Sequence, residues 1–173
     1  MSVPLWDAAA EDVLKRRAEQ LAKQTAAPET GDELEVVVCR LGDERYAIET
    51  RCLRAVQWAS GIAPVPCTPP YVVGIVSVRG EIVTLLDLAT MIGLRAQPAE
   101  AATCPVLLVG LPGLRCGLVV DEVLGVERLR LASLLPSLSG REFTRGLAPG
   151  PTVLLDLEHL LGSNRFTVAD EGL

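Results

Sequence analysis

The chain has 173 residues, 49% of them hydrophobic, which is enough to bury one substantial core. Its formal net charge of -6 would repel the phosphates of nucleic acids and the headgroups of acidic membranes, so we expect neither as a direct partner. No apolar run reaches the roughly 18 to 20 residues of a membrane span, and the N-terminus lacks the pattern of a signal peptide. These features predict a cytoplasmic protein.

Residues 1–24 read as a helical extension that differs in composition from everything after it. Asp7 is a suitable N-cap, Glu11 and Lys15 form one of several i,i+4 ion pairs, and a thin apolar stripe follows one face. The segment TAAPETGD, residues 25–32, then reads as a linker. Two interpretations stay open: a solvated helix packed lightly on the body, or a helix that docks a partner through Trp6.

Residues 33–163 form a body of short apolar runs, rich in Val and Leu and punctuated by Gly and Pro, which is typical of many short β-strands. The body repeats: residues 36–56 align with residues 106–126, each as a predicted hairpin, and LLDLATMIG (85–93) aligns with LLDLEHLLG (154–162). An Arg-Gly pair precedes each LLDL, at residues 79–80 and 145–146.

This repeat predicts two copies of one β unit of about 70 residues, each ending in a strand that leads into a short helix. Small β units close into barrels because closure removes exposed edges. We therefore predict a mostly β fold of two packed five-stranded barrels, followed by a tail at residues 164–173.

The repeat also places Asp87 and Asp156 at equivalent positions, as in enzymes where two carboxylates share a proton. Each Asp is followed by Leu and a helical apolar pattern, however, and not by the D-T-G or D-S-G loop of aspartic proteases. The pattern favours two helix N-caps instead. Because no other residues form a catalytic group, we do not expect an enzyme.

Metal and cofactor sites are not expected either. His159 is the only histidine, and residues 110–117 lack the spacing of a phosphate-binding loop. The cysteines are odd in number and form no C-x-x-C pair, so they indicate small buried thiols and neither disulfides nor a zinc site. They are Cys39, Cys52, Cys67, Cys104 and Cys116.

Three segments of the body resemble the CheW family. IAPVPCTPPYVVGIVSVRGEIVTLLDL, residues 62–88, follows that family's Pro-rich approach, aromatic, V-x-G, an R-G turn close to N-L-R-G, and D-L ending. Residues 117–126 and 152–161 are similar to two further signatures, in the same order. The resemblance implies two SH3-like barrels and an adaptor, without catalysis, that couples chemoreceptor tips to the regulatory domain of a CheA-type histidine kinase. It implies contact with the membrane only through the receptors.

The resemblance also implies which residues bind. A groove between the barrels would take the receptor's helical hairpin, with the receptor-binding residues Arg79, Leu53, Gly74, Val106 and Val126. Arg79 could instead be a solvated turn residue or fix the interface between the barrels. The first barrel would bind the kinase through Ala55 and Val56.

Some positions depart from the family pattern. Ser77 replaces the usual Asn and Thr84 the usual Pro, while Ala55 stands where the family often has an acidic residue on the kinase-facing side. A spacer that binds receptors but pairs weakly with the kinase is therefore an alternative. A generic SH3-like interaction module is another, although the six aromatic residues are too scattered to form a platform for proline-rich ligands.

Overall fold

A computed structural model of the chain describes residues 32–137 and 141–163. The expected helix at 1–24, the linker at 25–32 except for residue 32, and the whole tail at 164–173 lie outside these residues. Within the part that is described, no helix is long and apolar enough to cross a membrane.

The described residues are mostly β, as predicted. They contain ten strands: β1 (Glu33–Leu41), β2 (Glu44–Glu49), β3 (Leu53–Ser60), β4 (Val72–Val78), β5 (Glu81–Asp87), β6 (Thr103–Leu111), β7 (Leu114–Val119), β8 (Glu122–Arg130), β9 (Thr144–Ala148) and β10 (Thr152–Leu155). The helices are α2 (Leu88–Met91), α3 (Leu157–Gly162) and the 3-10 helices η1 (Thr50–Cys52) and η2 (Leu131–Ser133). Short helices follow β5 and β10, where the repeat predicted them.

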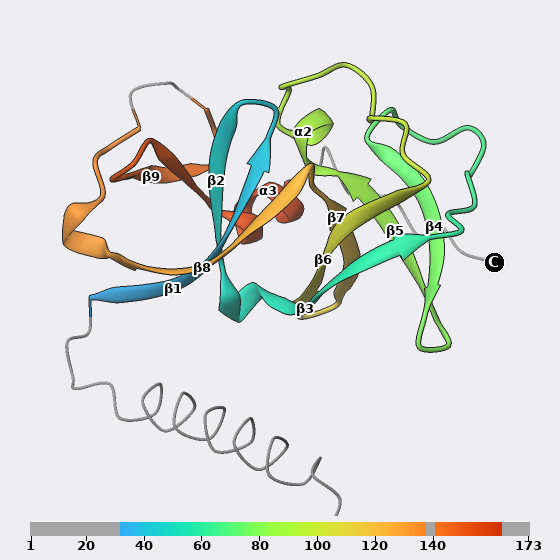
Figure 1. The fold of residues 1–173 in the computed structure, drawn as a ribbon, viewed down its shortest axis with the longest axis horizontal. Helices are drawn as coiled ribbons and strands as arrows, with labels where there is room; N and C mark the ends of the chain where they lie inside the picture. The colour runs from blue at the N-terminus through green and yellow to red at the C-terminus, as the bar shows by residue number, and fades with distance from the viewer. Residues whose placement is uncertain (1–31, 138–140, 164–173) are drawn as a thin grey trace, which may run out of the picture. The chain divides into compact units, whose positions relative to one another are not determined.

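The strands form two curled five-stranded sheets, which confirms the predicted fold (Figure 1). Barrel A has the strand order β8-β1-β2-β10-β9, and barrel B has the order β3-β6-β7-β5-β4. If β1 to β5 are taken as the counterparts of β6 to β10, replacing each strand by its counterpart converts one order into the other. The sequence repeat is therefore reproduced in the sheet topology.

Each barrel combines strands from both repeats. Barrel A takes the hairpin β1–β2 from the first repeat and β8, β9 and β10 from the second, and barrel B takes the reverse selection. Strand β10 runs parallel to β2, and β5 runs parallel to β7. Parallel neighbours cannot be joined by a tight turn and need a long connection. The connection from β2 to β10 passes through barrel B, so the two barrels are intertwined.

The matching of the two Arg-Gly pairs was wrong. Arg79 and Gly80 form the turn between β4 and β5, whereas Arg145 and Gly146 lie within β9. Gly74 is the true counterpart of Gly146, because the bridges Ala63–Ile75 and Leu135–Leu147 and the bulges beside both glycines coincide. The strands of the β9–β10 hairpin are shorter than those of β4–β5. Matching the two Arg-Gly dipeptides therefore paired residues that do not occupy equivalent positions in their hairpins.

Apolar side chains gather in three clusters within the described residues. One lies inside barrel A around Val36 and Leu154, and another inside barrel B around Leu85 and Val106. The largest lies between the barrels and includes side chains from both sheets and from α2 and α3. The barrels thus share one core and act as a single scaffold for surface residues.

Four of the cysteines are buried, as expected, but Cys67 is exposed in the loop before β4. Burial raises the pKa of the Cys39 thiol to about 12, and the nearby Asp121 carboxylate adds to this effect. Burial also raises the pKa of Cys116 to about 11. Both thiols are therefore protonated and unreactive at neutral pH.

The two repeated aspartates cap helices, which confirms that prediction. The Asp87 carboxylate accepts a hydrogen bond from the backbone N–H of Thr90 at 2.8 Å, and Asp156 accepts one from the N–H of His159 at 2.9 Å. Asp87 also accepts a 2.5 Å hydrogen bond from Arg95. These partners satisfy each carboxylate separately, so they do not form a shared-proton dyad.

Candidate functional site

Arg79 stands at the tip of the β4–β5 hairpin. The hairpin closes through two residues, because Val78 pairs directly with Glu81. Arg79 has a φ of 51° and Gly80 a φ of 84°, as expected for a type I′ turn. A non-glycine residue in this left-handed region costs about 1 kcal/mol, so the fold alone would favour Asn or Gly at position 79.

A cavity of about 430 Å³ opens beside this tip, at one end of barrel B. We call it the barrel B mouth. Strand β3 forms one side and the β4–β5 tip another, and residues of β5, β6 and β7 complete the lining. The lining residues are Arg54, Ala55, Gln57, Val78, Arg79, Glu81, Val83, Leu108, Val109, Arg115 and Cys116.

The two expected kinase-binding residues point to opposite faces of β3. Ala55 pairs with Leu108, whose side chain packs inside barrel B, so Ala55 also faces the barrel interior. Val56 faces outward and is 46% exposed. Trp58, two residues later on the same face, is 70% exposed. Ala55 therefore lines the mouth beside Arg79, while Val56 and Trp58 form an apolar surface on the other face.

The five expected receptor-binding residues do not share one surface. Arg79 is exposed at the barrel B tip, and Val126 is 61% exposed on β8 of barrel A. Leu53 is half-buried against the core between the barrels. Val106 is fully buried inside barrel B, and Gly74 is also buried. A partner could therefore reach Arg79 and Val126 directly, but neither Val106 nor Gly74.

Gly74 has a structural reason to be glycine. A Cβ atom there would lie 2.4 Å from the carbonyl oxygen of Ala63 and 2.8 Å from Cγ2 of Ile62, and φ is +153°. The missing side chain lets the chain before β4 form two backbone hydrogen bonds, each 2.9 Å, between Ala63 and Ile75. Gly74 thus fixes the position of β4 and, through it, of the Arg79 turn.

The barrel B mouth carries an excess of positive charge. Arg115 Nη1 donates to both carboxylate oxygens of Glu81 at 3.1 Å. Neither Arg54 nor Arg79 makes an ion pair with another described residue. The stem of Arg54 lies against Gly110, where a Cβ would come within 2.2 Å of Arg54 Cγ. Three guanidinium groups therefore line the mouth against one carboxylate.

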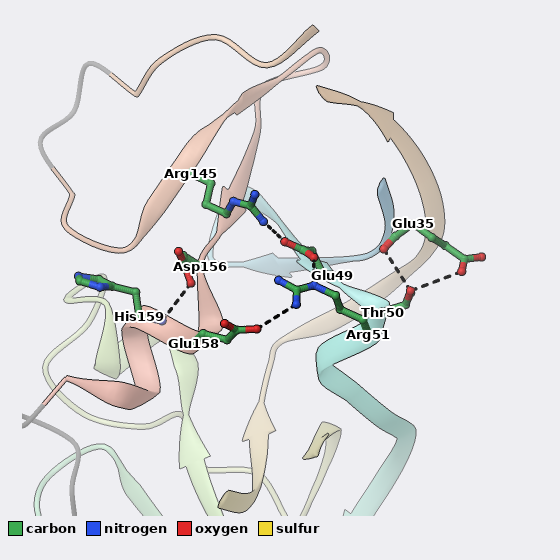
Figure 2. A network of polar contacts seen from close by, with 8 residues as sticks. All are labelled: Glu35, Glu49, Thr50, Arg51, Arg145, Asp156, Glu158 and His159. Atoms are coloured by element: carbon green, nitrogen blue, oxygen red, sulfur yellow. Dashed lines mark hydrogen bonds and ion pairs between the residues drawn. The ribbon is translucent and has the colours of Figure 1, made fainter. Parts of the chain in front are cut away.

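A second charged cluster is internally paired. Figure 2 shows Arg51 and Arg145 approaching the Glu49 carboxylate from two sides, and both donate hydrogen bonds to it. Glu49 is only 5% exposed, and Arg51 Nη1 also lies 3.0 Å from a carboxylate oxygen of Glu158. These contacts tie the end of β2, where the chain crosses to barrel B, to β9 and α3. The cluster therefore serves the scaffold.

Sequence patterns missed the part that Arg115 and Gln57 take in the mouth. Aligning the repeats would have found them, since residue 115 corresponds to Arg45 and residue 57 to Glu127 in barrel A. Arg45 and Glu127 form an ion pair there at 2.8 Å. In barrel B, Arg115 has the neutral Gln57 at the position that Glu127 holds in barrel A. This difference between the repeats was visible in the sequence.

Comparisons with known proteins agree with this geometry. The family model for the CheW-like domain matches residues 35–165. Protein FrzA of Myxococcus xanthus is 33% identical over 113 residues, covering 64% of this chain and 68% of FrzA. Chemotaxis protein CheW of Rhizobium meliloti (strain 1021) is 26% identical over 118 residues, covering 67% and 75% of the two chains.

A solved structure is also similar. The crystal structure of scaffolding protein TtCheW from Thermoanaerobacter tengcongensis superposes with a TM-score of 0.65 and 25% identity, covering 76% of this chain and 94% of that chain. The sequence match spans most of the two intertwined barrels, and the structural match has the same fold. This chain belongs to the CheW-like domain family.

Proposed function

We propose that this chain is a non-catalytic cytoplasmic adaptor that couples the cytoplasmic tips of chemoreceptors to the regulatory domain of a CheA-type histidine kinase. Membership of the CheW-like family supports this function, as do relatives named as chemotaxis and scaffolding proteins. One structural observation carries it: an exposed arginine is held in an unfavourable backbone conformation at a hairpin tip, where the fold does not require it.

On the receptor side, Arg79 supplies a planar set of donors that suits carboxylates and backbone carbonyls. Val126 offers exposed apolar area on barrel A, and Leu53 lies half-buried between the two barrels. Gly74 and Val106 contribute indirectly. Gly74 fixes the backbone position of β4, and Val106 packs inside the barrel that carries the Arg79 tip. A helical hairpin with acidic and apolar side chains fits this combination.

On the kinase side, we place the contact on the outward face of β3. Strand β3 is an edge of its sheet, pairs only with β6, and carries a single charged residue, Arg54. An edge strand with exposed Val56 and Trp58 is poorly protected against association, which is characteristic of an interface. Ala55 adds no charge to this face, because it points into the barrel.

The receptor contact is tested by Arg79→Glu. Reversing the charge removes no core volume, so we expect roughly tenfold weaker binding to a chemoreceptor signalling fragment with an unchanged Tm. Arg128→Glu is the matched control, because Arg128 is an exposed arginine on β8. Calorimetric titration of both variants decides the matter. Equal weakening by both would mean that general charge, and not Arg79, governs binding.

The kinase contact is tested by Trp58→Ala. Exposed Trp residues often dominate interfaces, so we expect roughly tenfold or greater weakening of binding to the kinase regulatory domain, with receptor binding retained. A spacer that binds receptors but pairs weakly with the kinase is the second candidate function. Wild-type protein that binds the receptor fragment but not the kinase domain would establish the spacer and refute coupling.

A further inference from the structure

The mouths of the two barrels are built from corresponding strands but carry different charges. In barrel A, Arg45 Nη2 donates to Glu127 Oε1 at 2.8 Å, so the arginine there is neutralised across the sheet. In barrel B, Arg115 keeps the position of Arg45, but Gln57 replaces the carboxylate of Glu127. Arg115 is paired instead with Glu81 from β5.

Two more arginines distinguish the barrel B mouth. Arg54 and Leu124 occupy the same bulge, since both are skipped where their strands shift register against β6 and β1. Arg79 lies at the two-residue tip of β4–β5, whereas the shorter β9–β10 hairpin turns through Pro-Gly-Pro at residues 149–151. Barrel B thus has two additional cations at its mouth.

These cations lie above an apolar floor. Val83 is only 8% exposed and Leu108 is half-buried, and both line the same cavity as Arg54 and Arg79. Ala55 lines the same cavity, and because its side chain ends at Cβ it fills little of the space. A cavity of about 430 Å³ is ample for one side chain and a neighbouring apolar group.

We propose that the barrel B mouth binds a carboxylate side chain from an acidic segment of a partner protein, held by Arg54 and Arg79, with an adjacent apolar side chain against Val83 and Leu108. Charge complementarity favours this occupant, because the chain carries -6 overall yet gathers three arginines against one carboxylate here. Guanidinium groups pair with carboxylates in two parallel hydrogen bonds, which gives the site orientation as well as attraction.

This site shares Arg79 with the proposed function but does not depend on it, since a carboxylate can bind whichever protein carries it. A peptide probe therefore tests the mouth separately from the receptor and the kinase. Failure of the receptor titration would remove the adaptor function without affecting the result described next.

The test is an NMR titration of the full-length isotope-labelled chain with the tripeptide acetyl-Leu-Glu-Leu-amide. We expect saturable shift changes at Ala55, Gln57 and Gly110, and none at the barrel A counterparts Gly125 and Glu127. The same peptide with Gln in place of Glu should bind roughly tenfold more weakly. Equal binding of the two peptides, or equal shifts in both barrels, would overturn the carboxylate site.

Sodium acetate at the same concentration separates a protein segment from a free anion. We expect acetate to cause much smaller shifts because it lacks the apolar neighbours. Shifts of the same size and position would mean that the mouth is a general anion site, which contradicts the peptide occupant.

Variants complete the test. Ala55→Glu supplies a tethered carboxylate beside Arg54 and Arg79, so it should block the peptide, as should Arg54→Gln by removing a donor. Arg128→Gln, which removes an exposed arginine from barrel A, is the matched control and should leave the peptide affinity unchanged. Retained affinity in both mouth variants with a preserved fold, checked by the spectra of barrel A, would overturn the site.

Discussion

Barrels A and B are two versions of one backbone, and their differences separate what the fold needs from what a partner could use. Strand orders, bulges and the glycines at positions 74 and 146 coincide between them. The charges at the two mouths do not coincide. Because barrel A folds with Leu124 at the position of Arg54 and with a different turn at the position of Arg79, the unpaired arginines of barrel B are not a requirement of the fold.

The shared bulges allow the two barrels to be compared residue by residue. Strand β3 shifts register against β6 between Leu53 and Ala55, and β8 shifts against β1 at the corresponding place between Val123 and Gly125. Side chains at matched positions therefore point in matched directions. A substitution at one position can be compared with the same substitution in the other barrel.

The largest expected effect is at Gly74. Gly74→Ala would place a Cβ 2.4 Å from a backbone oxygen at a φ of +153°, so we expect a loss of about 3 kcal/mol in the free energy of unfolding. At the matched Gly146 the nearest atom lies 3.0 Å away, and about 1 kcal/mol is expected. Chemical denaturation of the two variants measures both. Equal losses would show that the two barrels do not hold these glycines differently.

The capping aspartates come next. Asp87 is 1% exposed and bonded to Arg95, whereas Asp156 is partly exposed and caps α3 through the N–H of His159. Because Asn is also a good N-cap, Asp156→Asn should cost less than about 0.5 kcal/mol. Asp87→Asn also weakens a buried charge pair and should cost about 2 kcal/mol. Thermal unfolding would contradict this ranking if Asp156→Asn proved the more harmful change.

Arg79→Asn should move stability and binding in opposite directions. Asn tolerates the left-handed region better than Arg, so the free energy of unfolding should rise by about 0.5 to 1 kcal/mol. Receptor and peptide binding should weaken at the same time because the guanidinium is lost. A variant that is destabilised, or that binds normally, would assign Arg79 to the turn alone.

The smallest effect is a difference in thiol reactivity between the native cysteines, which is measured without any substitution. At pH 8 a thiol reagent should modify Cys67 first, because it is the exposed cysteine. At higher pH, Cys116 should react before Cys39, since burial raises the pKa of Cys116 only to about 11 and it lines the barrel B mouth. Mass spectrometry of timed samples gives the order. Earlier modification of Cys39 would mean that this thiol, buried in the core between the barrels, is more accessible than Cys116.

Much of the scaffold could be predicted from the sequence, because it repeats. The alignment of residues 36–56 with 106–126 predicted both hairpins, and the two LLDL segments predicted the strand-to-helix ends and their Asp caps. These features depend on local patterns, such as turn residues and apolar runs, that a sequence displays directly. The family signatures then identified the barrels as SH3-like and implied the adaptor function that we propose.

The site was harder to predict because it depends on register. Val106 and Val126 look alike in the sequence, yet one is fully buried and the other is 61% exposed. Ala55 and Val56 are neighbours but face opposite sides of β3. A shift of one residue reverses the face of a strand side chain, and the bulges that set this register have no clear sequence signature.

The bridging of receptor and kinase is tested most directly by a three-component retention assay. A chemoreceptor signalling fragment is immobilised, and the kinase regulatory domain is added with or without this chain. We predict that the kinase domain is retained only when the chain is present, and that Arg79→Glu and Trp58→Ala each abolish retention while Arg128→Glu does not. Binding of the chain to the receptor without any retention of the kinase domain would contradict the coupling function.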